Sequence, residues 1–133
     1  MADMFFELIT PERVIITTEV KSVVLPGAEG EMTIMPGHET LVTVLQLGMV
    51  TLTDFEGRKS RAFIWGGFAE ITGRKITVLA ERTLSPDDLS RDALDKEIGE
   101  METIIETSGG ETARREAEFA RDRLLQLRAT VTY

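Results

Sequence analysis

The residues of this chain that could carry chemistry are concentrated in one stretch, residues 26–48. The stretch reads PGAEGEMTIMPGHETLVTVLQLG and holds the only histidine, His38, as well as Glu29 and Glu31 on either side of Gly30. A histidine near a carboxylate can act as a general acid or base, and acids beside glycine can bind a metal ion. Glycine-rich turns can also hold a phosphate group or only shape the backbone. The stretch therefore has four interpretations: a catalytic site, a metal loop, a phosphate site or a structural turn.

The spacing of these residues does not support the three chemical interpretations. A phosphate-binding P-loop needs G-x-x-x-x-G-K-[ST] before a helix, but Gly30 is followed by Glu31 and Met32. A calcium loop needs alternating oxygen ligands over about twelve residues, which the glutamates here do not supply. With no cysteine and one histidine, the chain lacks the usual ligands for zinc. His38 as a base would need a nucleophile or an orienting acid, and the sequence identifies neither. We expect no catalytic residue, no metal and no cofactor, and interpret the stretch as a turn that contacts a partner.

The overall composition restricts the partners further. The formal net charge is −8 and the sequence pI is about 4.7, so the chain should repel nucleic acid. Its apolar runs fall short of the roughly 18 residues that a membrane span needs, and the N-terminus MADMFFELITPER does not resemble a signal peptide. We expect a soluble cytoplasmic protein whose membrane association, if any, comes through protein partners.

The first part of the chain, up to about Leu84, has the pattern of short strands. Its apolar segments are rich in β-branched and aromatic residues, several alternate apolar with polar side chains, and turn residues separate them. Such a series predicts an antiparallel sandwich or barrel. Gly66-Gly67 falls inside one of these segments and predicts a bulge or a close backbone approach. The predicted strands lie within residues 5–10, 14–25, 41–47, 49–55, 61–72 and 75–81.

At Ser85 the spacing of apolar residues changes from the period of two of a strand to the period of a helix. Ser85 is the expected N-cap, with Pro86 at the first helical position and Asp88 three residues after the cap. Apolar residues then recur at steps of three and four until Ser108-Gly109-Gly110, and they do so again from Ala113 onward. This pattern predicts two amphipathic helices in an antiparallel hairpin.

Three segments together resemble the epsilon subunit of F-type ATP synthases, the counterpart of the mitochondrial delta subunit. They are PGAEGEMTIMPGHETLVTVLQLGMV, FIWGGFAEI and ITVLAE, which follow the family's EGE, PGH, G-G-F and V-T-V-L-A pattern in order. The resemblance extends from Phe5 to Glu81, and the helical pattern follows where the family has a hairpin. One departure is Thr40, where the family commonly has proline after the histidine.

The resemblance implies a β + α fold in two domains. Residues 1–84 would form a ten-stranded antiparallel β-sandwich that docks on the gamma subunit and the c ring, and residues 85–133 a C-terminal antiparallel two-helix hairpin. The protein would be a non-catalytic central-stalk (rotor) subunit of a proton-translocating ATP synthase. It would couple rotation of the c ring to ATP synthesis by fixing gamma to the ring, at the cytoplasmic face of the bacterial inner membrane.

Four residues receive partner roles from the resemblance. Gly30 and Glu31 map onto the hairpin tip that contacts the polar loops of the c ring in related proteins. His38 and Thr43 map onto the segment that faces gamma. Residues 26–48 would then form a docking edge.

The resemblance also implies a regulatory role for the hairpin. In some family members it reaches the alpha and beta subunits and blocks ATP hydrolysis, or binds ATP through a motif I/L-D-x-x-R-A. Asp88 and Arg91 match this nucleotide motif, whereas Asp87 and Asp92 replace its apolar residue and its alanine. Extra acids beside a triphosphate are unfavourable, so Asp88 is also interpreted as a helix cap, with Arg91 paired to it or to Asp87.

Two alternatives to the coupling role stay open. One is an ATP-sensing regulatory subunit whose hairpin gates hydrolysis. The other is a free-standing sandwich enzyme that uses His38 and Glu31. The affinity for ATP separates the first alternative from the coupling role, and the activity of a His38→Ala variant tests the second.

Overall fold

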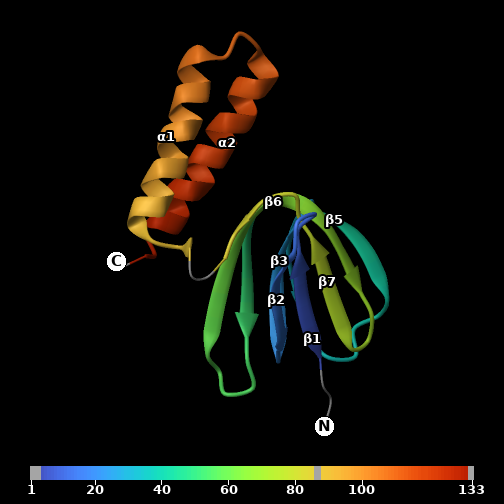
Figure 1. The fold of residues 1–133 in the computed structure, drawn as a ribbon. Helices are drawn as coiled ribbons and strands as arrows, with labels where there is room; N and C mark the ends of the chain where they lie inside the picture. The colour runs from blue at the N-terminus through green and yellow to red at the C-terminus, as the bar shows by residue number, and fades with distance from the viewer. Residues whose placement is uncertain (1–3, 86–87, 132–133) are drawn as a thin grey trace. The chain divides into compact units, whose positions relative to one another are not determined.

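The computed structural model describes residues 4–85 and 88–131. The chain divides into two compact units, Met1–Pro86 and Asp87–Tyr133, each of which is described by itself (Figure 1). The first unit contains strands and the second contains helices, as the change of period in the sequence predicted.

Eight strands occur in the described residues, and all belong to one sheet. The order is β2-β1-β7-β6-β5-β3-β4, with β8 paired to β6. The strands are β1 (Phe5–Ile9), β2 (Val14–Glu19), β3 (Ser22–Gly27), β4 (Gly30–Ile34), β5 (Leu41–Thr53), β6 (Lys59–Ile71), β7 (Lys75–Leu79) and β8 (Thr83–Leu84).

The prediction of ten antiparallel strands was wrong in both number and arrangement, although the sandwich with two helices was right. β1 pairs with β7 in parallel, so the sheet is mixed. These two strands are far apart in the sequence, and no short turn forces them to run in opposite directions. The sequence also suggested a break at Gly48, but β5 continues through it and is one strand of 13 residues.

The β5–β6 hairpin keeps one register along its whole length, from Leu41 paired with Ile71 to Thr53 paired with Lys59. Near its middle, Gly66 and Gly67 have φ values of 81° and 143°, which favour glycine. A Cβ atom on Gly67 would lie 2.1 Å from the carbonyl oxygen of Leu79. The glycines thus let β6 bend while its backbone passes close to β7, and the two long strands arch over the top of the sandwich in Figure 1. The predicted close backbone approach is confirmed.

The core lies between the curved layers of this sheet. Alternate residues of the strands point into it, as the period of two requires. The buried apolar cluster comprises Met4, Phe6, Leu8, Val20, Val23, Leu25, Ile34, Leu45, Val50, Leu52, Ala62, Ile64, Ala69, Ile71, Ile76, Val78 and Ala80.

The turn that joins β5 to β6 is closed by its own first residue. Asp54 accepts backbone hydrogen bonds from Arg58 at 2.8 Å and from Glu56 at 2.9 Å. The bond from Arg58 is the largest cause of a pKa of Asp54 below its ordinary value of 3.8. Phe55 is exposed on this turn, whose hydrogen bonds join its own residues.

The second unit is an antiparallel pair of helices, α1 (Arg91–Thr107) and α2 (Glu111–Arg128). Its seam is narrow, and Asp95 and Arg128 form an ion pair across it at 2.6 Å. Small residues on α2 leave room for the larger ones of α1, as close packing requires. The buried apolar residues of the two helices are Leu94, Ile98, Met101, Ala117, Ala120, Leu124 and Leu127.

The predicted start of α1 at Ser85 was wrong. The helix begins at Arg91, and Ser90 is the N-cap, because its hydroxyl accepts a hydrogen bond from the backbone N–H of Ala93 at 3.1 Å. Leu89 before the cap and Leu94 after it are both buried, as in a hydrophobic staple. The proposed positions of Pro86 and Asp87 lie outside the described residues.

We predict that Gly67→Ala destabilises the protein more than Gly30→Ala. Both glycines have similar positive φ values, 143° and 136°, so the two alanines share a backbone strain of roughly 1–3 kcal/mol. Only at Gly67 does the new Cβ collide with backbone, since nothing lies within 4 Å of the position on Gly30. The collision should add about 1–3 kcal/mol. Calorimetric melting of both variants measures the difference, and equal losses would contradict the role assigned to the bend.

Candidate docking surface

A row of apolar side chains, three of them exposed and one half-buried, crosses four adjacent strands of the first unit. Ile9 on β1 pairs with Leu79 on β7, Leu79 pairs with Phe68 on β6, and Phe68 pairs with Val44 on β5. Leu79, Phe68 and Val44 are 48%, 54% and 53% exposed, respectively. These four residues are called the apolar row below. A contiguous exposed apolar surface of this kind marks an interaction site more often than scattered apolar residues do.

The apolar row lies on the outer face because its neighbours in sequence occupy the inner one. Val78 precedes Leu79, and Ala69 follows Phe68; both are fully buried in the core. Successive side chains of a strand point to opposite faces, so the core contacts of one residue leave the next in solvent. Folding therefore requires Val78 and Ala69 to be apolar, but it gives no reason for Phe68 and Leu79 to be so.

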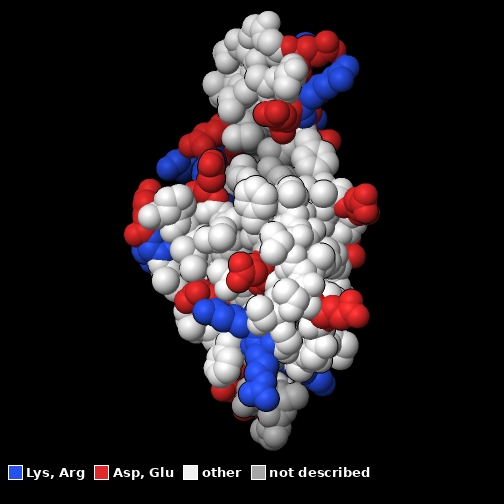
Figure 2. All heavy atoms as spheres, turned by 90° about the vertical axis from the view of Figure 1, so that its right-hand side faces the viewer, with Lys and Arg blue, Asp and Glu red and all other residues white. Residues whose placement is uncertain are grey.

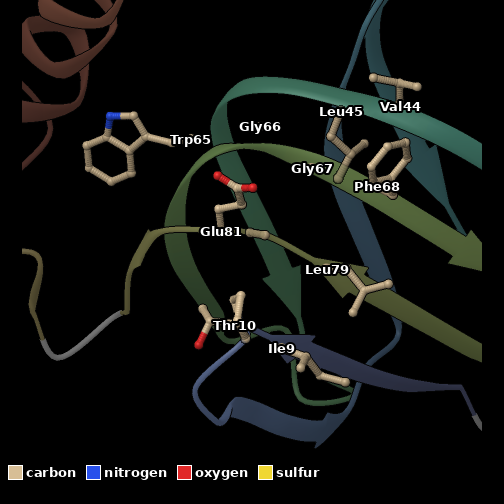
Figure 3. A pocket seen from close by; sticks show the side chains of 12 residues that line it. Ile9, Thr10, Val44, Leu45, Trp65, Gly66, Gly67, Phe68, Leu79 and Glu81 are labelled. Atoms are coloured by element: carbon tan, nitrogen blue, oxygen red, sulfur yellow. The ribbon is translucent and has the colours of Figure 1, made fainter.

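A groove of about 630 Å³ runs beside the apolar row and over the glycine bend (Figure 3). Figure 3 shows Val44 and Phe68 side by side on neighbouring strands, with Leu79 and Ile9 following on the next two. The groove is mostly apolar and has one carboxylate, that of Glu81. Its lining residues are Ile9, Thr10, Pro11, Val44, Leu45, Trp65, Gly66, Gly67, Phe68, Leu79, Ala80 and Glu81.

The tip of the β3–β4 hairpin is attached to β5 next to the apolar row. The backbone N–H of Ala28 donates to the carbonyl of Val44 at 3.2 Å, and the Gln46 side chain donates to the carbonyl of Gly27 at 3.0 Å. Glu31 and Gly30 at this tip are exposed. Two predicted contact residues thus lie on an exposed tip beside the row, and acidic side chains gather at this edge.

Figure 2 shows one face of the molecule, on which uncharged atoms predominate and acidic and basic side chains are both scattered among them.

His38 lies in the loop between β4 and β5 and is half-buried. Its backbone N–H donates to Met35 at 3.2 Å, and its Nδ1 donates to the carbonyl of Glu39 at 2.7 Å. These bonds hold the ring against its own loop. Within residues 4–85 and 88–131, no group of three or more His, Cys, Asp or Glu side chains is arranged to hold a metal ion.

Thr43 occupies the inner face of β5. It pairs with Ala69, which is fully buried, and it is itself half-buried. The neighbouring Val42, 67% exposed, and Val44 of the apolar row point outward instead. Val42 and Val44 are therefore better placed than Thr43 to contact a partner.

The candidate nucleotide residues, Asp88 and Arg91, lie just before and at the start of α1, and both are exposed. The N–H of Ala93, which could contact a phosphate, is already bonded to Ser90. Asp92 adds negative charge in the first turn. The start of α1 is therefore already capped, and an acidic side chain lies where a phosphate would need a hydrogen-bond donor.

Three arginines on this unit already have acidic partners. Arg128 pairs with Asp95, and on α2 Arg115 pairs with Glu111 at 3.0 Å and Arg121 with Asp122 at 3.2 Å. Residues 85–133 together carry twelve acidic and seven basic side chains. The local charge therefore disfavours a nucleotide.

The apolar row was missed in the sequence, although a signal for it was present. The segments GGFAEI and ITVLAE place apolar residues at consecutive positions, so both faces of those strands carry one. A strand with one solvated face should instead alternate apolar and polar residues.

No helix in the described part of the chain is long and apolar enough to cross a membrane.

Comparison with known proteins gives concordant matches. Residues 3–86 match the family described as ATP synthase, Delta/Epsilon chain, beta-sandwich domain. The ATP synthase epsilon chain of Parvibaculum lavamentivorans is 38% identical over 95% of this chain and 96% of its own length. That of Allorhizobium ampelinum is 46% identical over 74% and 73%, respectively.

Solved structures show the same fold. A chain in the Euglena gracilis mitochondrial ATP synthase, in a structure of its F1 and c-ring parts, matches with a TM-score of 0.76 and 24% identity, over 97% of this chain and 81% of that one. A chain in the central stalk and c-ring structure from Tetrahymena thermophila mitochondrial ATP synthase matches with a TM-score of 0.68 and 13% identity, over 92% and 94%.

We predict that this chain does not bind magnesium-ATP more tightly than about millimolar, which corresponds to roughly −4 kcal/mol. The acids around Asp88 and the occupied N–H of Ala93 are the physical reasons. Titration calorimetry with and without magnesium measures the affinity, and Arg91→Ala should leave the trace unchanged. Micromolar binding that Arg91→Ala abolishes would establish a nucleotide site here.

Proposed function

This chain belongs to the delta/epsilon family of ATP synthase subunits, whose members are non-catalytic parts of that complex, and we propose that it is a rotor subunit that fixes gamma to the c ring. It would in this way couple ring rotation to ATP synthesis in the catalytic head. Support comes from relatives matched over nearly their whole length and from similar chains in central-stalk and c-ring structures.

The observation that carries the proposal is the apolar row with its adjacent groove. We infer that gamma covers this surface, with Val42 and His38 at its margin. Complete burial of an apolar side chain is worth about 1.5–3 kcal/mol, so the half-exposed residues of the row could each contribute about 1 kcal/mol. A contact at this surface would also explain why these residues are apolar although folding does not require it. Thr43 would act from the inner face, by shaping β5.

The contact with the c ring is assigned to the β3–β4 tip. Gly30 gives the tip its sharp turn at a φ of 136°, and Glu31 presents a carboxylate to the polar ring loops. The hydrogen bond from Ala28 to Val44 joins this tip to the apolar row. Two partners that bind adjacent edges of one rigid sandwich would be held at a constant distance, as a coupling element requires.

The division of labour follows the two units. Residues 1–84 would dock on gamma and the ring, and residues 85–133 would regulate. The protein would lie at the cytoplasmic face of a bacterial inner membrane, associated with it only through the complex, and would use no cofactor.

A second role, inhibition of ATP hydrolysis, is favoured by one feature of α2. Phe119 is 42% exposed, and the Arg123 guanidinium lies 5.0 Å from the centre of its ring. An aromatic ring stacked with a cation suits an acidic surface with apolar residues, such as one on the alpha or beta subunit. In the alternative of an ATP-sensing subunit, magnesium-ATP would control the same hairpin.

We predict that Phe68→Ser weakens binding to purified gamma about tenfold while the isolated chain stays folded. The ring of Phe68 is 54% exposed, so its loss should affect the interface more than the core. The matched control is Phe55→Ser, which removes an aromatic ring with 47% exposure from the β5–β6 turn. Calorimetric titration of gamma measures both. If the two variants bind alike, gamma does not cover the apolar row.

A separate prediction concerns the ring-facing tip. Glu31→Lys should reduce assembly with the purified c ring several-fold at low ionic strength, and the deficit should shrink as salt screens the new repulsion. Glu19→Lys makes the same charge change at the exposed end of β2 and should have little effect. Co-sedimentation with ring-containing vesicles over a range of salt concentrations gives the measurement. A deficit that is equal in both variants would remove Glu31 from the interface.

A further inference from the structure

The segment that leaves the sandwich, residues 80–84, is hydrogen-bonded first to the end of β1 and then to β6. The backbone N–H of Ala80 donates to the carbonyl of Ile9 at 3.0 Å, and that of Trp65 donates to the carbonyl of Arg82 at 3.1 Å. The Thr83 hydroxyl donates to the carbonyl of Phe63 at 2.9 Å. Strand β8 is only two residues long, so backbone pairing alone would hold this segment weakly.

A stack of side chains reinforces that short pairing. The guanidinium carbon of Arg82 lies 4.2 Å from the centre of the Trp65 ring, within the range of a cation–π interaction. Trp65 in turn contacts Phe63 edge to face, with ring centres 4.9 Å apart and an angle of 81° between the planes. Phe63 belongs to the same β6 segment that pairs with β8. The stack thus joins the departing segment to a fixed strand.

We propose that the Arg82–Trp65 stack is a latch that holds β8 on β6 and so sets where the paired part of the first unit ends. With the latch closed, β8 stays paired and the chain is fixed as far as Leu84. With it open, residues 81–84 lift from β6, a segment that would span about 13 Å when extended, at 3.3–3.6 Å per residue.

The residue that carries this indole also lines the docking groove, although its ring points away from the apolar row (Figure 3). Glu81 lines the groove as well, and Arg82 follows Glu81 directly. A molecule that fills the groove would therefore lie next to the latch. This consequence rests on the proposed docking of gamma, whereas the latch itself is a property of the isolated chain.

Hydrogen exchange at the Trp65 amide tests the latch in the isolated full-length chain. Its N–H is bonded to Arg82, so it exchanges when the segment lifts from β6. Arg82→Ala should speed this exchange about two- to fivefold, the range expected for loss of an exposed cation–π contact. Arg82→Lys, which keeps a cation, should recover part of the protection. The matched control, Arg74→Ala, removes an exposed arginine from the β6–β7 turn and should leave the rate unchanged.

Trypsin provides a second readout that keeps Arg82 in place. Trp65→Leu removes the ring platform, and cleavage after Arg82 should become at least twofold faster than in the wild type, with fragments identified by mass. Phe55→Leu is the control for loss of an aromatic ring. Unchanged Trp65 exchange in Arg82→Ala, or unchanged cleavage in Trp65→Leu, would overturn the latch. Neither result depends on whether gamma binds, which the Phe68→Ser titration decides.

Discussion

The close approach of the β6 backbone to the carbonyl of Leu79 at Gly67 is the constraint on which the sandwich depends. A side chain at this position has no space, since an ideal Cβ would lie 2.1 Å from that oxygen. Because the β5–β6 hairpin keeps its register from one end to the other, the two long strands bend together and do not break apart. One continuous sheet can then supply both layers around the core. Because the strands bend at these two glycines, the two layers are connected without the loops that two separate sheets would need.

The same bend creates the surface that is available to a partner. The groove lies over Gly66 and Gly67, where the missing side chains leave the backbone uncovered. The alternation of side chains then forces Phe68 and Leu79 outward, because Ala69 and Val78 are required inside. The outer residues have no folding role that would select an apolar side chain, and the proposed contact with another subunit would account for their apolar character. Folding and docking thus depend on opposite faces of the same few strands.

Local sequence patterns predicted the elements, and long-range contacts decided how they are arranged. Alternation gave the strands, and the steps of three and four gave both helices. The parallel pairing of β1 with β7 had no local signal, because it joins segments that are distant in sequence. Gly48 looked like a break between strands, but it accommodates Pro26 of a neighbouring strand, whose Cβ would lie 2.9 Å from a Cβ added there. Ser85 and Ser90 both resemble helix caps in sequence, and only the buried residues on either side of Ser90 distinguish them. The same limit applies to the candidate docking surface. The exposed β3–β4 tip could be located from the sequence motif, whereas the apolar row is formed only by the pairing of residues on four strands.

The two units are stabilised in ways that suit different tasks. The sandwich is closed by pairings between distant strands around a continuous core, so its docking face cannot deform without loss of many contacts at once. The hairpin has a seam only a few side chains wide and an ion pair at its open end, so it can fray or separate at lower cost. None of the seam residues belongs to the apolar row or to the β3–β4 tip. A change in the hairpin therefore need not alter the surface assigned to gamma and the ring. Under the proposed function, torque would pass through the sandwich alone, and the hairpin would be left to regulate.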